Sequence, residues 1–88
     1  MSKISKEIII KIKQGMHARP AAMFVQIASQ YDADVIIRTS EEEVNGKSIM
    51  GLLTLGLPCD SKVVLEVDGT DAEKVLEELE KILLQEDI

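Results

Sequence analysis

The alternation of apolar and polar side chains along the chain predicts four β-strands. In residues 8–13, every second position is an isoleucine that would face a core, namely Ile8, Ile10 and Ile12. Residues 62–68 alternate in the same way, with Val63, Leu65 and Val67 on the inner face. Residues 34–38 form another apolar run, and the short segment 43–44 can pair back onto it. We therefore expect short strands, each with one face toward water.

Apolar residues spaced three and four positions apart predict helices between these strands. The first helix, over residues 18–30, carries a stripe of small side chains that would pack close to a neighbour, namely Ala18, Ala21, Ala22, Val25 and Ala28. The second covers only residues 48–55. Asn45 or Ser48 would cap its start, and Gly56 would end it.

The last helix begins after a cap at Thr70 or Asp71 and buries one face, made of Ala72, Val75, Leu76, Leu79, Ile82 and Leu83. The element order is therefore βαββαβα. Because each strand has one apolar face, one layer of helices should cover one side of the sheet, and the alternation favours antiparallel pairing. We expect an α+β fold in a single domain over residues 1–88, an open-faced β-sandwich with a four-stranded antiparallel sheet and three helices on one face.

Charge is distributed unevenly along this pattern. The net charge of −6 opposes non-specific binding to nucleic acid. Residues 1–30, however, hold five basic side chains against one acidic side chain, a net +4, while residues 31–88 hold five against fifteen, a net −10. Part of the first third of the chain should therefore prefer anions.

The cysteine and histidine content bears on the cellular compartment and on metal binding. Cys59 is the only cysteine, so it forms no internal disulfide, and this favours a reducing cytoplasm. One histidine and one cysteine far apart in the sequence do not suggest a metal site. We see neither a signal peptide nor an apolar run of about 20 residues. We expect a cytoplasmic protein with no metal, no cofactor and no membrane insertion.

The only histidine, His17, stands between the first strand and the first helix. If His17 is the N-cap, Pro20 falls in the first turn, where its missing N–H has no intrahelical partner. The free amides of Ala18 and Arg19, the helix dipole and the Arg19 guanidinium would then form an anion site. Neutral imidazole, the main form near pH 7, is a nucleophile that can accept a phosphoryl group. Gly15 would allow a sharp turn and the close approach of a partner.

The run from Gly15 to Ala21 (Gly-Met-His-Ala-Arg-Pro-Ala) is similar to the active-site signature of the HPr family, the histidine-containing phosphocarriers of the bacterial phosphoenolpyruvate:sugar phosphotransferase system. The resemblance extends to residues 31–34 and 54–56. It implies the HPr-like fold, phosphorylation of His17 on Nδ1 and support of transfer by Arg19. It also implies Enzyme I as donor and enzyme IIA domains of sugar transporters as acceptors.

A second segment, Val44 to Gly51, resembles the regulatory segment of the branch of this family that is phosphorylated on serine. That serine would be Ser48, and HPr kinase/phosphorylase would be the enzyme that modifies it. A hydroxyl at a helix N-terminus can take a phosphate with little structural damage, because the helix dipole favours the added charge. The plain alternative is an N-cap serine with no regulatory role.

Some apolar side chains cannot all be buried. Ile49, Met50 and Leu53 cannot all point into the core from so short a helix, and Met23 falls opposite the small-residue stripe. An apolar patch beside an anion site is typical of a docking face. We therefore expect a partner-binding surface made of Met23, Lys47, Ile49, Met50 and Leu53.

The leading hypothesis is a monomeric carrier protein rather than an enzyme, with His17 as its phosphoryl acceptor. The alternative is a purely regulatory HPr-like protein that acts through Ser48 in carbon catabolite repression, with catabolite control protein A as a partner. A small RNA-binding αβ module can share this element order. The acidity and the two aromatic residues, Phe24 and Tyr31, argue against it.

Overall fold

The strands and helices follow the predicted order βαββαβα. A computed structural model describes residues 2–88, with the strands β1 (Ser2–Ile9), β2 (Asp34–Arg38), β3 (Glu43–Asn45) and β4 (Lys62–Gly69). The helices are α1 (Ala18–Ala28), α2 (Ile49–Leu55) and α3 (Ala72–Leu84). Within residues 2–88, no helix has the length and apolar character needed to cross a bilayer.

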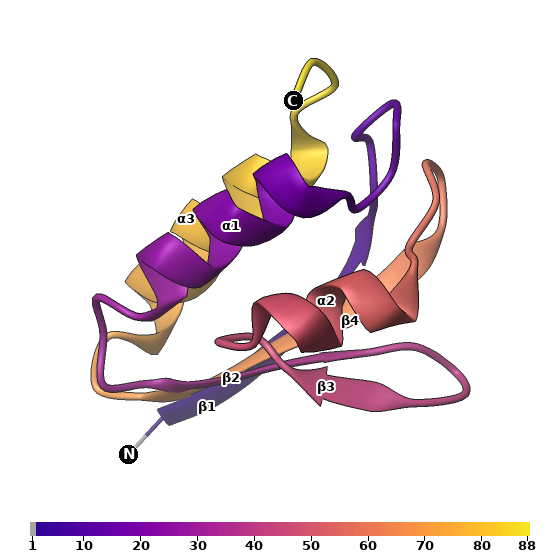
Figure 1. Cartoon of the computed structure of the whole chain (residues 1–88). Coiled ribbons are helices and arrows are strands. Elements are labelled where there is room, and N and C mark those ends of the chain that lie inside the picture. The colour runs from indigo at the N-terminus through magenta and orange to yellow at the C-terminus, as the bar shows by residue number, and fades with distance from the viewer. Residues whose placement is uncertain (1) are drawn as a thin grey trace.

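The four strands form one antiparallel sheet in the spatial order β1-β4-β2-β3. Figure 1 shows α1 and α3 lying side by side above the sheet, with α2 beside β3. The predicted class, an open-faced sandwich with the helices on one face, is confirmed. The first and last strands of the sheet are thereby edges, and β1 is held along its whole length by β4, from Ser2 opposite Gly69 to Ile9 opposite Lys62.

The core lies between the sheet and the helices and is mostly aliphatic. Phe24 of α1 is its only aromatic side chain and is fully buried. Burying one such large apolar side chain stabilises the fold by roughly 1.5–3 kcal/mol. The strand residues with no more than 1% of their surface exposed are Val35, Ile37, Val63, Leu65 and Val67. The alternation in residues 62–68 therefore does mark the inner face of the sheet, and the apolar run in residues 34–38 supplies Val35 and Ile37 to the same face.

The first strand differs from its prediction, because β1 begins at Ser2 and ends at Ile9. Ile10 and Ile12 are fully buried but lie in the loop after the strand. The N–H of Ile10 donates to Ser61 O at 2.9 Å, and the N–H of Lys11 donates to Leu83 O at 2.9 Å. The alternation reports burial, which continues after the main chain has left its ladder with β4.

The predicted stripe of small residues on the first helix is only partly buried. Ala21 and Ala28 are buried together with Pro20 and Phe24, whereas Ala18 and Ala22 are exposed. Phe24 has by far the largest apolar surface on this helix, so its position decides which face turns inward. The helix ends at Ala28 rather than at Gln30, with Ser29 as its C-cap.

The caps of the other helices separate the alternatives left open above. Ser48 is the N-cap of α2, and its Oγ accepts a hydrogen bond from Gly51 N at 2.9 Å. Asn45 instead accepts from Lys47 N at 2.8 Å in the preceding turn. Gly56 ends the helix in the left-handed conformation, as predicted. Asp71 is the N-cap of α3 by backbone position and makes no side-chain cap bond.

The uncovered face of the sheet carries ion pairs centred on Glu66 of β4. Its carboxylate pairs with Arg38 of β2 and with Lys3 of β1, at 3.4 Å for the latter. The hydrogen bond from Arg38 lowers the pKa of the Glu66 carboxyl below its usual value. This face is therefore cross-linked by charge from β1 through β4 to β2.

We expect this carboxylate to make folding stability depend on pH in the acid range. Because its folded pKa is lowered, the stabilisation is fully present above about pH 4.5, the ordinary value, and is lost as pH falls through the folded value. Urea denaturation should therefore show the wild type more stable than Glu66→Gln at pH 7, with a smaller difference at pH 3. Glu41→Gln, which removes a carboxylate without an ion pair in residues 2–88, is the control. A wild-type advantage that stays constant from pH 7 to pH 3 would contradict the pairing.

Candidate functional site

A tight turn delivers the chain to His17. Gly15 N donates to Ile12 O at 2.9 Å, and Met16 N donates to Leu57 O at 2.7 Å. Gly15 has a φ of 75°, and a side chain there would place its Cβ 2.6 Å from Leu57 O. The sharp turn expected at Gly15 is therefore present. The Leu57 carbonyl approaches Gly15 closely, and the close approach of a partner at this glycine stays a prediction.

His17 is the N-cap of α1, and its backbone is extended there, with φ −116° and ψ −172°. Its carbonyl accepts the first helical bond from Ala21 N at 3.1 Å, while its side chain makes no cap bond. Within residues 2–88, the amides of Ala18 and Arg19 have no hydrogen-bond acceptor, and Pro20 has no N–H. Two amides thus point out of the positive end of the helix, next to a half-buried imidazole.

The ring of His17 is oriented by a residue far away in the sequence. Its Nε2 lies 3.1 Å from the main-chain oxygen of Ile88. A main-chain oxygen only accepts hydrogen bonds, so Nε2 is the nitrogen that carries the proton in the neutral ring. The other nitrogen, Nδ1, then has a free lone pair. The contact therefore selects which nitrogen can act as a nucleophile.

The last turn of α3 and the segment after it are held in place by main-chain hydrogen bonds to the loop before His17. Lys11 N donates to Leu83 O at 2.9 Å, and Lys13 N donates to Glu86 O at 3.1 Å. Figure 1 shows this end of the chain beside the loop that joins β1 to α1. Two segments about 70 residues apart in sequence therefore form the two walls of one site.

Between these walls lies a groove of about 300 Å³ that His17 lines. One wall consists of Lys13, Gln14, His17 and Arg19, and the other consists of Glu86, Asp87 and Ile88. The structure thus brings His17 and Arg19 together, as predicted. Sequence reasoning missed the other five residues. The excess of basic residues in the first 30 positions could have pointed to Lys13, but no local pattern marks residues 86–88.

Ser48 belongs to a different element, at the start of α2. It is half-buried, and its hydroxyl is already occupied as the acceptor for Gly51 N. Ser48 is therefore an N-cap serine, a position that both readings of this residue share, and its regulatory role stays a prediction.

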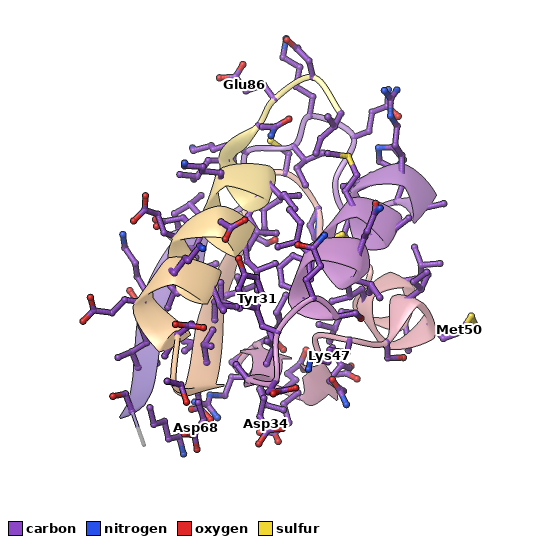
Figure 2. All side chains as sticks on the ribbon, turned by 90° about the vertical axis from the view of Figure 1, so that its left-hand side faces the viewer. Tyr31, Asp34, Lys47, Met50, Asp68 and Glu86 are labelled. Carbon is purple, nitrogen blue, oxygen red and sulfur yellow. The ribbon has the colours of Figure 1, made fainter. Side chains whose placement is uncertain are left out.

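The five residues of the predicted docking surface differ in exposure, and their role in binding stays a prediction. Met50 and Ile49 are exposed, with 72% and 40% of their surface accessible. Met23 and Leu53 are partly buried and pack against the core. The Lys47 ammonium donates a hydrogen bond to Tyr31 O at 2.8 Å. Figure 2 shows Met50 projecting from α2, while Lys47 lies beneath Tyr31. Helix α2 packs against α1, and of its predicted docking residues Leu53 is partly buried while Ile49 and Met50 are exposed.

Comparison with known proteins places this geometry in one family. The family described as PTS HPr component phosphorylation site matches residues 4–85. The chain belongs to this family of phosphocarrier proteins of the phosphotransferase system. The phosphocarrier protein HPr of Buchnera aphidicola subsp. Schizaphis graminum is 41% identical over 80 residues, which are 91% of this chain and 94% of that protein.

Proteins similar to this chain include both HPr and the HPr-like protein Crh. The crystal structure of HPr from Bacillus anthracis has a TM-score of 0.88 and 37% identity, and covers 94% of this chain and 99% of that one. The HPr-like protein Crh of Bacillus subtilis is 36% identical over 83 residues, 94% of this chain and 98% of that protein. The crystal structure of Crh is described as a dimer with a swapped domain. It has a TM-score of 0.76 and 35% identity, and covers 97% of this chain and 98% of that one. Membership of the family therefore does not by itself establish the monomeric state that we expect.

The packing of Gly15 against Leu57 makes substitution there costly. In Gly15→Ala, the positive φ and the collision with Leu57 O should together lower the free energy of unfolding by about 1–3 kcal/mol. Gly56→Ala is the matched control, because Gly56 also has a positive φ but has no atom within 4 Å of a built Cβ. Chemical denaturation should show the larger loss for Gly15→Ala. Equal losses in the two variants would contradict the contact with Leu57.

Proposed function

We propose that this protein carries a phosphoryl group on Nδ1 of His17, received from phospho-Enzyme I and passed to enzyme IIA domains of sugar transporters. The observation that carries the proposal is the bond between His17 Nε2 and Ile88 O, because it leaves Nδ1 unprotonated. Membership of the phosphocarrier family supports the same reading. The protein would be a carrier rather than a catalyst that turns over a small molecule.

The chosen tautomer makes the transfer simple. The lone pair of Nδ1 forms a bond to phosphorus, while the bond from phosphorus to the donor breaks and its electron pair stays on the donor. Because Nδ1 carries no proton beforehand, no general base is needed. The reverse exchange of bonds delivers the phosphoryl group to the next acceptor and restores the neutral ring with its proton on Nε2.

The residues around the ring suit the charge of the transferred group. In phosphoryl transfer, charge is spread over the three non-bridging oxygens, so catalysis consists mainly of positioning and electrostatic stabilisation. The unpaired amides of Ala18 and Arg19 and the Arg19 guanidinium supply donors beside His17. The groove is open on one side, which leaves the group accessible to a partner protein.

The test is transfer from Enzyme I charged with labelled phosphoenolpyruvate. The wild type should acquire an acid-labile label, and His17→Ala should acquire none. Arg19→Gln should be labelled about 10²-fold more slowly, the usual effect of removing one electrostatic donor. Lys81→Gln, which removes an exposed cation on α3, should match the wild type. Equal labelling of His17→Ala and the wild type would overturn the proposal.

A second role through Ser48 is favoured by the similarity to Crh and by the position of this serine at the start of α2. In this role, HPr kinase/phosphorylase would phosphorylate Ser48, and catabolite control protein A would read the modification. The exposed pair Ile49 and Met50 lies directly after Ser48 and would belong to the surface that such a partner contacts. The signature around His17 is intact, which favours transport and regulation together over regulation alone.

The two roles can be separated with two variants. An ATP-dependent HPr kinase should label the wild type and His17→Ala but not Ser48→Ala, and sugar uptake should be lost only in His17→Ala. Ser48→Ala should also lose about 0.5–2 kcal/mol of stability, because it removes the cap of α2. Thr54→Ala, which removes another hydroxyl from the same helix, serves as the control. A label that persists on Ser48→Ala would rule out the serine assignment.

The setting that suits these roles is the cytoplasm, where the unpaired thiol of Cys59 would stay reduced. We propose that the protein works there as a monomer, with β1 completing its own sheet. Sedimentation at working concentration tests this directly, since Crh offers the contrasting dimer.

A further inference from the structure

The basic side chains of the molecule differ in what they are already bound to. Of the ten lysines and arginines, six lie within 4.0 Å of a carboxylate in residues 2–88, namely Lys3, Lys6, Lys11, Arg38, Lys62 and Lys81. Lys47 donates to Tyr31 O, and Lys74 lies over the Tyr31 ring at 5.9 Å. In this part of the chain, only Lys13 and Arg19 have neither a carboxylate, nor a hydrogen-bond acceptor, nor an aromatic ring as a partner.

These two unengaged cations lie in the same place. Both line the groove that holds His17, about 300 Å³ in volume. Two carboxylates, Glu86 and Asp87, line the opposite wall, and yet neither forms an ion pair with them in residues 2–88. The groove thus keeps two positive charges available at the point where an anion would be attached.

Lys13 is fixed by its main chain and free at its side chain. Its N–H donates to Glu86 O at 3.1 Å, and the neighbouring Ile12 is fully buried. The turn closed between Ile12 O and Gly15 N follows directly. The main-chain position of Lys13 relative to the ring is therefore set by the fold, while its ammonium can move within the groove.

The charges of the groove give a second cation a role in balancing a phosphoryl group on His17. Without a phosphoryl group, Lys13 and Arg19 balance Glu86 and Asp87. A phosphoryl group on the ring adds further negative charge to a space that already contains two carboxylates. Arg19 alone would leave those carboxylates opposing the product. A second cation offsets them.

We infer that Lys13 is a second phosphoryl-binding residue of the His17 site, which favours the phosphorylated form by contacting the phosphoryl oxygens and offsetting Glu86 and Asp87. The inference deepens the proposed function and rests on it. Lys13 is a positioning and charge-balancing residue, and His17 remains the group that forms the covalent bond. The carboxylates act in the opposite direction, so the transfer potential of the group is set by both walls.

The experiment compares Lys13→Gln with Lys11→Gln, which removes a cation two positions earlier whose ammonium is already paired with Asp60 at 3.1 Å. With catalytic Enzyme I and a fixed ratio of phosphoenolpyruvate to pyruvate, the ratio of phosphorylated to free protein should fall about two- to fivefold in Lys13→Gln, as expected for the loss of one exposed ion pair. Lys11→Gln should match the wild type, and Lys13→Arg should restore the ratio.

A spectroscopic readout separates contact with the phosphoryl group from a structural role. In ³¹P NMR, the midpoint of the pH titration of the phosphohistidine signal should move to higher pH in Lys13→Gln, because a cation that favours the dianion is lost. Glu86→Gln should move both the midpoint and the equilibrium in the opposite direction. All variants should unfold at the same urea concentration as the wild type.

The outcomes distinguish the two levels of the account. If the wild type acquires no phosphohistidine, the proposed function fails. If the wild type is phosphorylated but Lys13→Gln and Lys11→Gln give the same equilibrium and titration, the function stands and the role of Lys13 is overturned. The inference is supported if the equilibrium and the titration midpoint change in Lys13→Gln but not in Lys11→Gln, and if both change in the opposite direction in Glu86→Gln.

Discussion

The hydrogen bond between His17 Nε2 and the main-chain oxygen of Ile88 is the contact on which the proposed chemistry of this protein depends. Imidazole has two nitrogens, and a neutral ring presents only one of them as a nucleophile. A main-chain oxygen that can only accept hydrogen bonds decides between them. The contact exists because the loop before α1 is bonded through Lys11 to the last turn of α3 and through Lys13 to the segment after it. The main chain thus sets the protonation pattern of a side chain about 70 residues away.

Charge is used in two different ways in the molecule. On the uncovered sheet face, cations such as Lys3 and Arg38 are bound to Glu66 and hold strands together. At the His17 end, Lys13 and Arg19 are left without such partners. Figure 2 shows how far the two acidic regions are separated, with Glu86 at one end and Asp34 and Asp68 at the other. Structural ion pairs and basic side chains without such partners therefore coexist in a small chain with a net charge of −6.

The sequence was sufficient for the features that depend on local patterns. It predicted the class, the element order and the N-cap position of His17, because alternation, caps and Pro20 act within a few residues. It misplaced the end of β1, since burial of Ile10 and Ile12 continues beyond the ladder. It could not predict the wall formed by residues 86–88, which arises from main-chain bonds between distant segments. Nor could it predict the hydrogen bond from the Lys47 ammonium to Tyr31 O, because no side-chain pattern marks a main-chain carbonyl.

The tautomer of the neutral His17 ring tests this account most directly. In protein labelled with ¹⁵N in its single imidazole, two-bond ¹⁵N–¹H correlations above the titration range of the ring report which nitrogen is protonated. We predict the proton on Nε2 and a bare Nδ1 in the unphosphorylated protein. A ring protonated on Nδ1 would contradict the account, since the free lone pair would then lie on the nitrogen that faces Ile88.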